Sequence, residues 1–528
     1  MEGYIRLSVD QFVSSGLKRR GGLWRRWAAP VGVWAALVGA HAPLLRLPYY
    51  WDEAGYYVFA ALDCFRHGWL IPRSTLANGH PPLLSLYLAL VWTLAGFHIL
   101  ATRAAMLAWA AALICAVYKL AEARLGARAA LVPPLLVAVA PLVFAQGSLA
   151  QLDLPVAALI LWALVAREQR RPWVEAGLLV AACLMKETAV IVPAVLLLYD
   201  RRKGLRYLFP IAALAAWYLY YHAHTGYWFG NPQYFAYNLS TTAVSLPRVA
   251  LSLVRRIWQL AFYDGTGIVT LVAAIAWWRT RKQTAPVSAA QSWPVAWILV
   301  LGVYLLFHAA VGGAVLARYL LPALALYYLG AAELILKLPR AGWWVAGCAA
   351  VLVASWFWNP PYPFPYEDNL AYAHFVRLHE TAARVLAAHP PAGAIWTAWP
   401  ATDELTRPAL GYVIRPLAVH PLSNFSRETL AGLRGTPAEL YLYSRTYQPT
   451  LNVADDTPFW TRWAQEYFNF ARPAPPAAWL ARLHLHPVFR RAAHGQWVLL
   501  ARPTANSPAS EVGAAARSAP SRGSPDRR

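Results

Sequence analysis

Long apolar segments separated by short polar loops cover the first two thirds of the chain. A helix that crosses a bilayer needs about 20 mostly apolar residues, so this repeating pattern predicts a polytopic α-helical membrane protein. The loop charges allow about eleven of the segments to cross. The apolar segments are residues 28–47, 83–100, 104–120, 130–146, 155–165, 173–184, 189–198, 207–221, 268–278, 294–307, 319–337 and 343–358.

Basic residues are concentrated in alternate loops, and this asymmetry predicts the orientation of the chain. Loops with an excess of Lys and Arg stay on the cytoplasmic side. The segment 83–100 must then lie along the outer surface or only partly in the membrane. The parts expected inside are residues 1–27 and the loops around Arg124, Arg170, Arg201 and Arg281.

One stretch between apolar segments has helical spacing of its own. From Leu246 to Phe262, apolar residues recur every three or four positions beside Arg248, Arg255 and Arg256. A helix of this kind is expected to lie in the membrane interface, with its apolar face toward the acyl chains.

The pattern changes after residue 358, where an amphipathic helix is predicted over 372–388. Short apolar runs at 393–399, 439–443 and 496–501 predict strands. An odd number of spans places this part outside the cytoplasm. The expected divisions are a cytoplasmic basic N-terminus (1–27), a transmembrane domain (28–358), an extracytoplasmic α/β or α+β domain (359–503) and a disordered tail (504–528).

Composition supports the membrane class. Of 528 residues, 59% are hydrophobic and 14% are charged, whereas soluble domains carry about 25% charged residues. The net charge of +22 would indicate nucleic acid in a soluble protein. Here the basic residues lie largely in loops, where they face lipid headgroups, so no nucleic-acid partner is expected.

Two acidic residues, Asp52 and Glu53, directly follow the first apolar segment within the aromatic stretch Tyr49–Tyr57. Tyr and Trp are typical of the membrane–water boundary. Acids at such a boundary can simply be solvated in a loop. The predicted orientation, however, brings them to the same face as other charged groups from separate loops, namely His80, Asp153, Lys186 and Arg318.

Each of these four residues also has an ordinary interpretation. Asp153 can cap a helix, Lys186 can extend its amine to the membrane surface, Arg318 can anchor at the interface, and His80 can be a loop residue. Their convergence on one face favours a shared function. A carboxylate can accept the proton of an attacking hydroxyl, and Lys and Arg can stabilise a phosphate leaving group.

Several other enzyme classes have no motif here. The sequence has no P-loop, no Gly-rich dinucleotide motif, no His-Glu-x-x-His and no Gly-x-Ser-x-Gly elbow. An ATP-driven pump, a zincin and a serine hydrolase are therefore disfavoured. The four cysteines show no spacing typical of a metal site or a disulfide framework.

The order of five short motifs resembles the C-type (GT-C fold) glycosyltransferases. The resemblance covers residues 28 to about 358 and is strongest to the branch with protein O-mannosyltransferases and lipid A aminoarabinose transferases. The motifs are Trp51-Asp52-Glu53-Ala54-Gly55-Tyr56, Gly79-His80-Pro81-Pro82-Leu83, Gln151-Leu152-Asp153, Met185-Lys186-Glu187-Thr188 and Ala317-Arg318-Tyr319-Leu320-Leu321-Pro322.

This resemblance implies a polyprenyl-phosphate sugar donor and transfer to an acceptor outside the cytoplasm, at the inner membrane of the cell. It implies that Asp52 is the base and that Asp153 lies near the acceptor. Glu53 is expected to orient a neighbour or bind a cation, because adjacent side chains on a helical turn diverge by about 100° and cannot both face one substrate. A divalent metal held by Asp52 and Asp153 is possible in such a site.

The resemblance also places the donor phosphate near Lys186, Arg318 and Tyr319. His80 stands where aminoarabinose transferases carry Lys before Pro-Pro-Leu, and its part in phosphate binding depends on its protonation. A transporter or flippase of lipid-linked sugars is the alternative. It would favour internal repeats with broken helices, and the sequence shows no such repeat.

The orientation gives a first testable prediction. A reporter that is active only in the cytoplasm, fused after Arg502, should be silent because residues 359–503 are expected outside. The same reporter fused in the loop around Arg170 should be active and serves as the control. Activity at Arg502 would contradict the orientation and separate Asp52 from its proposed partners.

Overall fold

A computed structural model describes residues 28–232, 245–281, 293–311, 316–360, 364–445 and 473–503. The predicted basic N-terminus, the predicted disordered tail and part of the aromatic loop before residue 245 lie outside these residues. The described chain forms two compact units. Unit 1 contains Tyr56–Trp358 and Glu367–Leu370 with the segment before Leu47, and unit 2 contains Leu47–Gly55, Asn359–Tyr366 and the chain from Ala371.

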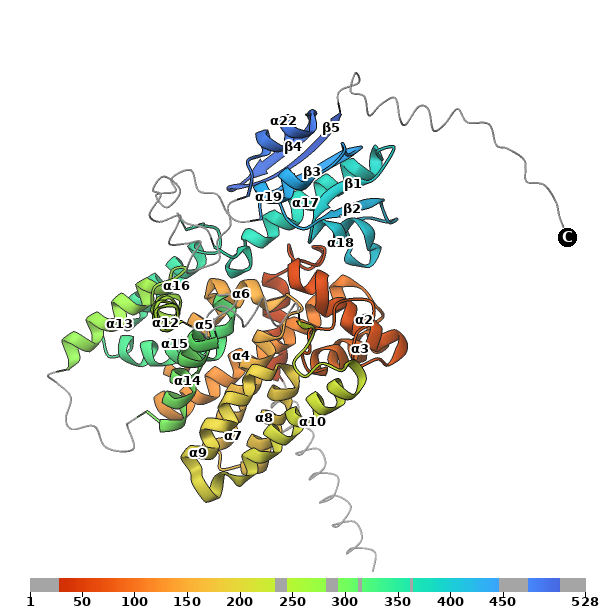
Figure 1. The fold of residues 1–528 in the computed structure, drawn as a ribbon. Coiled ribbons are helices and arrows are strands. Elements are labelled where there is room, and N and C mark those ends of the chain that lie inside the picture. The colour runs from red at the N-terminus through yellow and green to blue at the C-terminus, as the bar shows by residue number, and fades with distance from the viewer. Residues whose placement is uncertain are drawn as a thin grey trace, which may run out of the picture. The chain divides into compact units, whose positions relative to one another are not determined.

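Unit 1 is built of helices (Figure 1). Its α-helices after Ala28–Ala40 are α2 (Val58–His67), α3 (Leu83–Ala95), α4 (Ile99–Leu125), α5 (Val132–Val139), α6 (Pro141–Gly147), α7 (Asp153–Glu168), α8 (Pro172–Met185), α9 (Ile191–Asp200), α10 (Leu208–Thr225), α12 (Leu246–Ala261), α13 (Thr266–Thr280), α14 (Val295–Val311), α15 (Leu321–Ile335) and α16 (Ala341–Ala354). Short 3-10 turns connect several of them, and α7 packs between α4 and α8. This packing buries nearly every side chain of α7, including its first residue, Asp153.

The expected count of about eleven spans is not confirmed. Among the described helices, only α4 is long and apolar enough to cross a membrane alone. Two bent pairs, Ala129–Val139 with Pro141–Gly147 and α12 with α13, pass the same test only when each pair is taken together. The other apolar helices have 10–17 residues. A helix of 14 residues rises only about 21 Å, less than the roughly 30 Å of a hydrocarbon core.

The predicted segment 130–146 is bent rather than straight. Its two helical parts meet at an angle of 69°. Ala140 is extended between them, and Pro141 opens the second helix. Proline lacks an N–H donor and clashes with the preceding turn, which explains the break.

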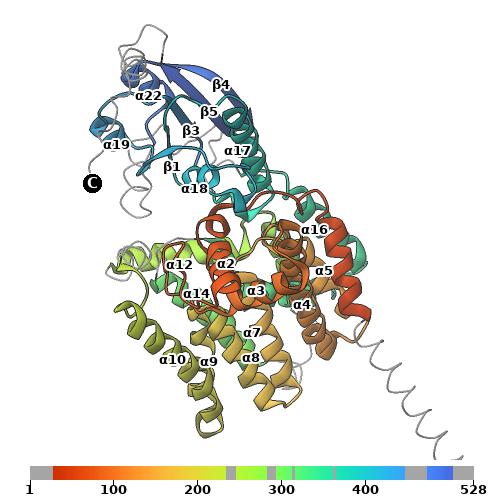
Figure 2. The ribbon, with the colours of Figure 1, turned by 90° about the vertical axis from the view of Figure 1, so that its right-hand side faces the viewer.

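Unit 2 contains a five-stranded sheet with the order β2-β1-β3-β5-β4 (Figure 1). Figure 2 shows β1, β3, β5 and β4 from a second direction. Its strands are β1 (Ile395–Ala398), β2 (Val419–Leu422), β3 (Glu439–Tyr443), β4 (Leu485–Ala493) and β5 (Gln496–Pro503). The first three run parallel to one another, and β5 is antiparallel to both β3 and β4. The α-helices are α17 (Ala371–Ala388), α18 (Ala401–Thr406), α19 (Arg427–Gly432) and α22 (Pro476–Leu483).

The helix and the three strands predicted for this region correspond to α17, β1, β3 and β5. The strands β2 and β4 were not predicted, and both lie at the edges of the sheet. His494 and Gly495 connect β4 to β5, both with positive φ. That conformation matches the right-handed twist of a tight hairpin.

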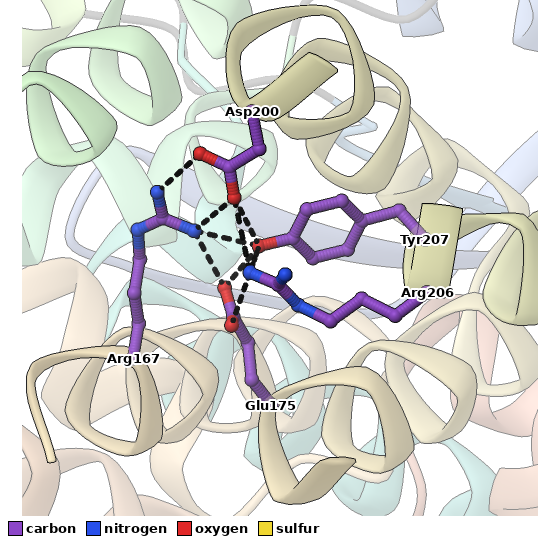
Figure 3. A network of polar contacts seen from close by, with 5 residues as sticks. All are labelled: Arg167, Glu175, Asp200, Arg206 and Tyr207. Atoms are coloured by element: carbon purple, nitrogen blue, oxygen red, sulfur yellow. Dashed lines mark hydrogen bonds and ion pairs between the residues drawn. The ribbon is translucent and has the colours of Figure 1, made fainter. Parts of the chain in front are cut away.

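A partly buried polar network ties the ends of α7, α8 and α9 together within unit 1 (Figure 3). Arg167 makes an ion pair with Asp200 at 2.7 Å and with Glu175 at 3.1 Å. Arg206 also pairs with both acids, at 3.0 and 3.2 Å. The Tyr207 hydroxyl accepts from Arg167 at 2.6 Å and donates to Glu175 at 2.5 Å. Each acid is therefore neutralised by two guanidinium groups.

Removing one guanidinium from this network should destabilise unit 1. Arg167→Ala leaves the buried Glu175 with a single cation, and we expect a loss of about 2–4 kcal/mol. The measurement is a thermal unfolding midpoint in detergent. The matched control is Lys119→Ala, which removes a solvent-exposed pair with Glu122 and should cost only about 0.3 kcal/mol. Equal shifts in the two variants would contradict a stabilising role for the network.

Candidate functional site

The centre of the candidate site is a carboxylate held between two cations. Asp153 is the first residue of α7, and Lys186 caps the C-terminal end of the adjacent α8. The Lys186 Nζ lies 2.6 Å from Asp153 Oδ1. The Arg318 Nε lies 3.2 Å from Asp153 Oδ2, which brings in the 3-10 turn Ala317–Leu320. All three side chains are less than a tenth exposed, so their attraction is little screened by solvent.

A second carboxylate neutralises the other side of Arg318. The Arg318 Nη1 lies 2.8 Å from Glu367 Oε2 and also donates to Gln151 Oε1. Gln151 in turn donates to Glu367 at 3.0 Å. The four charged groups, Asp153, Glu367, Lys186 and Arg318, form a balanced buried cluster of two acids and two cations.

Tyr319 forms an aromatic face beside this cluster. The Lys186 Nζ lies 4.1 Å from the centre of the Tyr319 ring, a distance at which a cation is attracted to the ring. The guanidinium carbons of Arg318 and Arg256 are each 5.8 Å from the same centre. His308 of α14 stacks on the ring at 5.3 Å.

His80 lies in a separate ion pair of unit 1. Its Nδ1 is 2.7 Å from Glu187 Oε2, one residue after Lys186. Burial by itself would raise the pKa of Glu187, but its attraction to His80 and Lys186 lowers that pKa to about 2. Glu187 is therefore ionised at all physiological pH values.

Asp368 is a third acid near Arg318 and differs from the first two in its ionisation. Burial and the neighbouring Glu367 carboxylate raise the pKa of Asp368 to about 7, against a hydrogen bond from the Tyr263 hydroxyl at 2.8 Å. Near neutral pH this carboxyl group is only partly ionised, so it adds less than a full negative charge to the site.

Asp52 and Glu53 belong to unit 2, whereas the charged cluster belongs to unit 1. The Tyr50 N–H donates to Glu53 Oε1 at 2.6 Å, and Glu53 is buried. Trp51 has a φ of 47°, which an L-residue adopts only at a cost. Its ring packs on Trp399 at 5.1 Å and on Phe375 at 5.8 Å, and this packing holds the backbone in place.

The close approach of another side chain explains why the same motif has a glycine at position 55. A Cβ atom at Gly55 would lie 2.8 Å from the Trp399 ring. Trp399 Nε1 also donates to Asp403 Oδ2 at 3.1 Å, which fixes the ring against Gly55. The backbone that carries Asp52 is therefore shaped by residues more than three hundred positions later in the chain.

The structure brings Asp153, Lys186, Arg318 and Tyr319 into direct contact, and it places His80 with Glu187. The sequence analysis did not include Glu367, Glu187 or Arg256 among the site residues. Glu187 was visible in the Met-Lys-Glu-Thr motif, whereas Glu367 lies beyond the last apolar segment and follows no pattern. Arg256 was assigned to the polar face of an interfacial helix, but its side chain is buried.

The described residues do not fit a divalent metal site around Asp153. Both of its oxygens are already paired with cations. In the described part of the chain, no group of three or more His, Cys, Asp and Glu side chains is arranged to hold a metal ion.

Comparison with known proteins gives a family model and a set of similar folds. Residues 79–228 match the model of the dolichyl-phosphate-mannose-protein mannosyltransferases, a range that includes His80, Asp153 and Lys186. No curated protein matches the chain significantly.

Two crystal structures of ArnT from Cupriavidus metallidurans have similar folds. The one bound to undecaprenyl phosphate has a TM-score of 0.50 at 13% identity and covers 91% of this chain and 98% of that chain. The apo form gives 0.50 at 14% identity, with coverages of 92% and 98%. An oligosaccharyltransferase from Archaeoglobus fulgidus gives 0.39 at 14% identity, with 71% of this chain and 59% of that chain covered. The family model and the ArnT fold confirm that this chain resembles the GT-C fold glycosyltransferases, which use polyprenyl-phosphate sugars.

Proposed function

We propose that this chain is a membrane glycosyltransferase that moves a sugar from a polyprenyl-phosphate donor to an extracytoplasmic acceptor, which is a lipid, a glycan or a protein. The main observation is the buried cluster in which Asp153 lies between Lys186 and Arg318. Burying these charges is expensive unless they are used or well paired. The undecaprenyl phosphate bound to ArnT supports a lipid carrier of the same class here.

In the proposed reaction, an acceptor oxygen attacks the anomeric carbon of the sugar. A bond forms between that oxygen and the carbon, and the bond from the carbon to the phosphate oxygen breaks. The electron pair of the broken bond stays on the phosphate, and Asp52 accepts the proton of the acceptor hydroxyl. Attack on the face opposite the leaving phosphate inverts the anomeric configuration.

The other motif residues have supporting roles in this proposal. Lys186, Arg318 and Tyr319 line the donor phosphate, where negative charge grows during transfer. His80, paired with Glu187, adds a hydrogen-bond donor to the same site. Asp153 lies near the acceptor and holds both cations in place. Glu53 supports the backbone of the motif through the Tyr50 N–H.

The proposal also includes location and domain roles. Residues 28–358 form the transferase domain in a multi-pass inner-membrane protein, with the active site on the extracytoplasmic face. Residues 359–503 form the extracytoplasmic domain. The hydrophobic surface of unit 1 and the basic loops match a lipid bilayer as the principal partner.

A transporter of lipid-linked sugars is the alternative function. It could use the same cationic site for the lipid phosphate but would leave the sugar–phosphate bond intact. A reconstituted assay with a radiolabelled polyprenyl-phosphate sugar separates the two functions. A transferase produces a labelled acceptor and free polyprenyl phosphate, whereas a transporter only moves the intact donor between leaflets.

The phosphate assignment predicts the effect of a conservative change at Arg318. Arg318→Lys keeps the charge, but one amine cannot pair with Asp153 and Glu367 in the same planar arrangement. Turnover should fall at least about tenfold, because charge-assisted hydrogen bonds contribute about 1.5–3 kcal/mol. Arg340→Lys, at an exposed position, is the matched control. Equal turnover in both variants would rule out this role for Arg318.

The base assignment predicts a selective loss of turnover. Asp52→Asn keeps the shape of the side chain and removes its basicity, so turnover should fall by a factor of about 10² to 10⁴ with donor binding largely kept. Asp153→Asn serves as the comparison in the same assay. Full activity of Asp52→Asn with an inactive Asp153→Asn would assign the base to Asp153. Full activity of both would sink the glycosyltransferase proposal.

A further inference from the structure

A buried histidine and glutamate of unit 2 form a pair that the proposed reaction does not use. His379 is on α17 and Glu404 is on α18, and His379 Nδ1 lies 2.6 Å from Glu404 Oε2. Both side chains are buried. Within the described chain, His379 Nε2 and Glu404 Oε1 have no hydrogen-bond partner. Each side chain therefore depends on the other to offset the cost of its burial.

The pair is connected to the segment before Asp52 through Phe375. Phe375 and His379 are four residues apart on α17, so they share one face of the helix. Their rings stack at 3.9 Å. Phe375 also contacts Trp51 at 5.8 Å and Tyr50 at 5.5 Å. The position of His379 therefore helps to fix the ring against which Trp51 and Tyr50 pack.

A second connection runs through α18, a helix of six residues. Isolated helices shorter than about 12 residues are marginal in water, so contacts with the rest of unit 2 must hold α18 in place. Glu404 supplies one such contact, with His379. The preceding residue, Asp403, accepts a hydrogen bond from Trp399 Nε1 at 3.1 Å. The Trp399 ring packs on Trp51 at 5.1 Å, so a shift of α18 would move the second ring that holds Trp51.

The backbone of Trp51 needs this support from two sides because it is strained. Its φ of 47° lies in the left-handed region, which is costly for a residue other than glycine. Such a conformation persists only where the surrounding packing enforces it. Asp52 is the next residue, so the direction of its carboxylate depends on the Trp51 backbone. Relaxation of Trp51 to an ordinary φ would turn Asp52 away from its present direction.

We propose that the His379–Glu404 pair positions Asp52 for proton transfer. The pair acts through the two aromatic rings that hold the Trp51 backbone in its left-handed conformation. The role of Asp52 as the base comes from the proposed function, on which this inference rests. Because both members of the pair are buried, they are positioning residues and not catalytic groups. Apolar side chains of similar volume often stabilise a protein as well as a buried polar pair does, but they lack a hydrogen bond that fixes one orientation of the two helices.

The test uses the full-length protein in lipid nanodiscs and measures hydrogen exchange and steady-state kinetics. The Tyr49, Tyr50 and Glu53 amides are hydrogen-bonded, so exchange in residues 47–55 reports the order of this segment. Glu404→Leu should speed that exchange about ten- to a hundredfold, as expected for the loss of a hydrogen bond to a charged group. It should lower kcat at least about tenfold. The KM of the polyprenyl-phosphate sugar should stay unchanged, because a base acts in the transition state.

Glu439→Leu is the matched control. It removes a buried carboxylate of β3 that is paired with Arg502 in the same unit. The thermal unfolding midpoint should fall in this variant and in Glu404→Leu. Exchange in residues 47–55 and kcat should stay as in wild type in the control alone. Equal effects of the two substitutions on the segment would show a role in domain stability only and would overturn the proposal.

A double variant, His379→Phe with Glu404→Leu, separates position from stability. Two apolar side chains leave no buried polar group unpaired, so the unfolding midpoint should return to near that of wild type. Exchange in residues 47–55 should stay fast and kcat should stay low, because the hydrogen bond between α17 and α18 is missing. Glu404→Gln keeps an acceptor oxygen for His379 and should recover part of the kcat that Glu404→Leu loses.

Three results would overturn the positioning role. They are recovery of kcat together with the unfolding midpoint in the double variant, wild-type exchange of residues 47–55 in Glu404→Leu, and a lower kcat with wild-type exchange. Failure of the proposed function gives a different result. If the wild-type protein transfers no sugar but Glu404→Leu still exchanges faster in residues 47–55, the positioning of the segment is supported and only the proposed function is contradicted.

Discussion

The buried ion pair between Asp153 and Lys186 is the constraint on which the first unit depends. Two helices, α7 and α8, meet at this point, and Arg318 joins from a distant turn. Removing Asp153 would leave Lys186 without this ion pair, and removing Arg318 would leave Glu367 without its own. At a site of low polarity, such a loss costs several kcal/mol. The polar network at the opposite ends of α7 and α8 holds the same pair of helices. The helix pair is thus fixed by charge at both ends and by apolar packing between them.

Sequence patterns predicted the elements that have a buried apolar face. The helix α17 and the strands β1, β3 and β5 were expected, and three of these four supply many of the buried residues of unit 2. The strands β2 and β4 were missed because edge strands carry polar residues and proline, such as Pro421 and Pro487, that weaken the alternating pattern. The number of spans could not be obtained from apolar runs alone, because hydropathy does not show where a helix is short or bent.

The charged centres of the site could be predicted, but their partners could not. Asp153, Lys186 and Arg318 were singled out because the predicted orientation of their loops brings them to one face of the membrane. Glu367 could not be predicted as a site residue because it lies in a part of the chain with ordinary polar composition. Arg256 was misassigned because a helix with three arginines looks like an interface, and only the packing of α12 shows which arginine points inward. Contacts between side chains that are distant in the sequence depend on the folded chain, so local sequence patterns do not predict them.

The segment Leu47–Gly55 belongs to unit 2 although the ribosome makes it long before the rest of that unit. The Tyr412 hydroxyl donates to the Tyr49 carbonyl across 363 residues. At a synthesis rate of roughly 5–20 residues per second, the partner residues appear about 20–70 s later. The motif that carries Asp52 therefore cannot reach its final shape during insertion of the early helices. The packing of this early segment is therefore completed only after the later part of unit 2 has been synthesised.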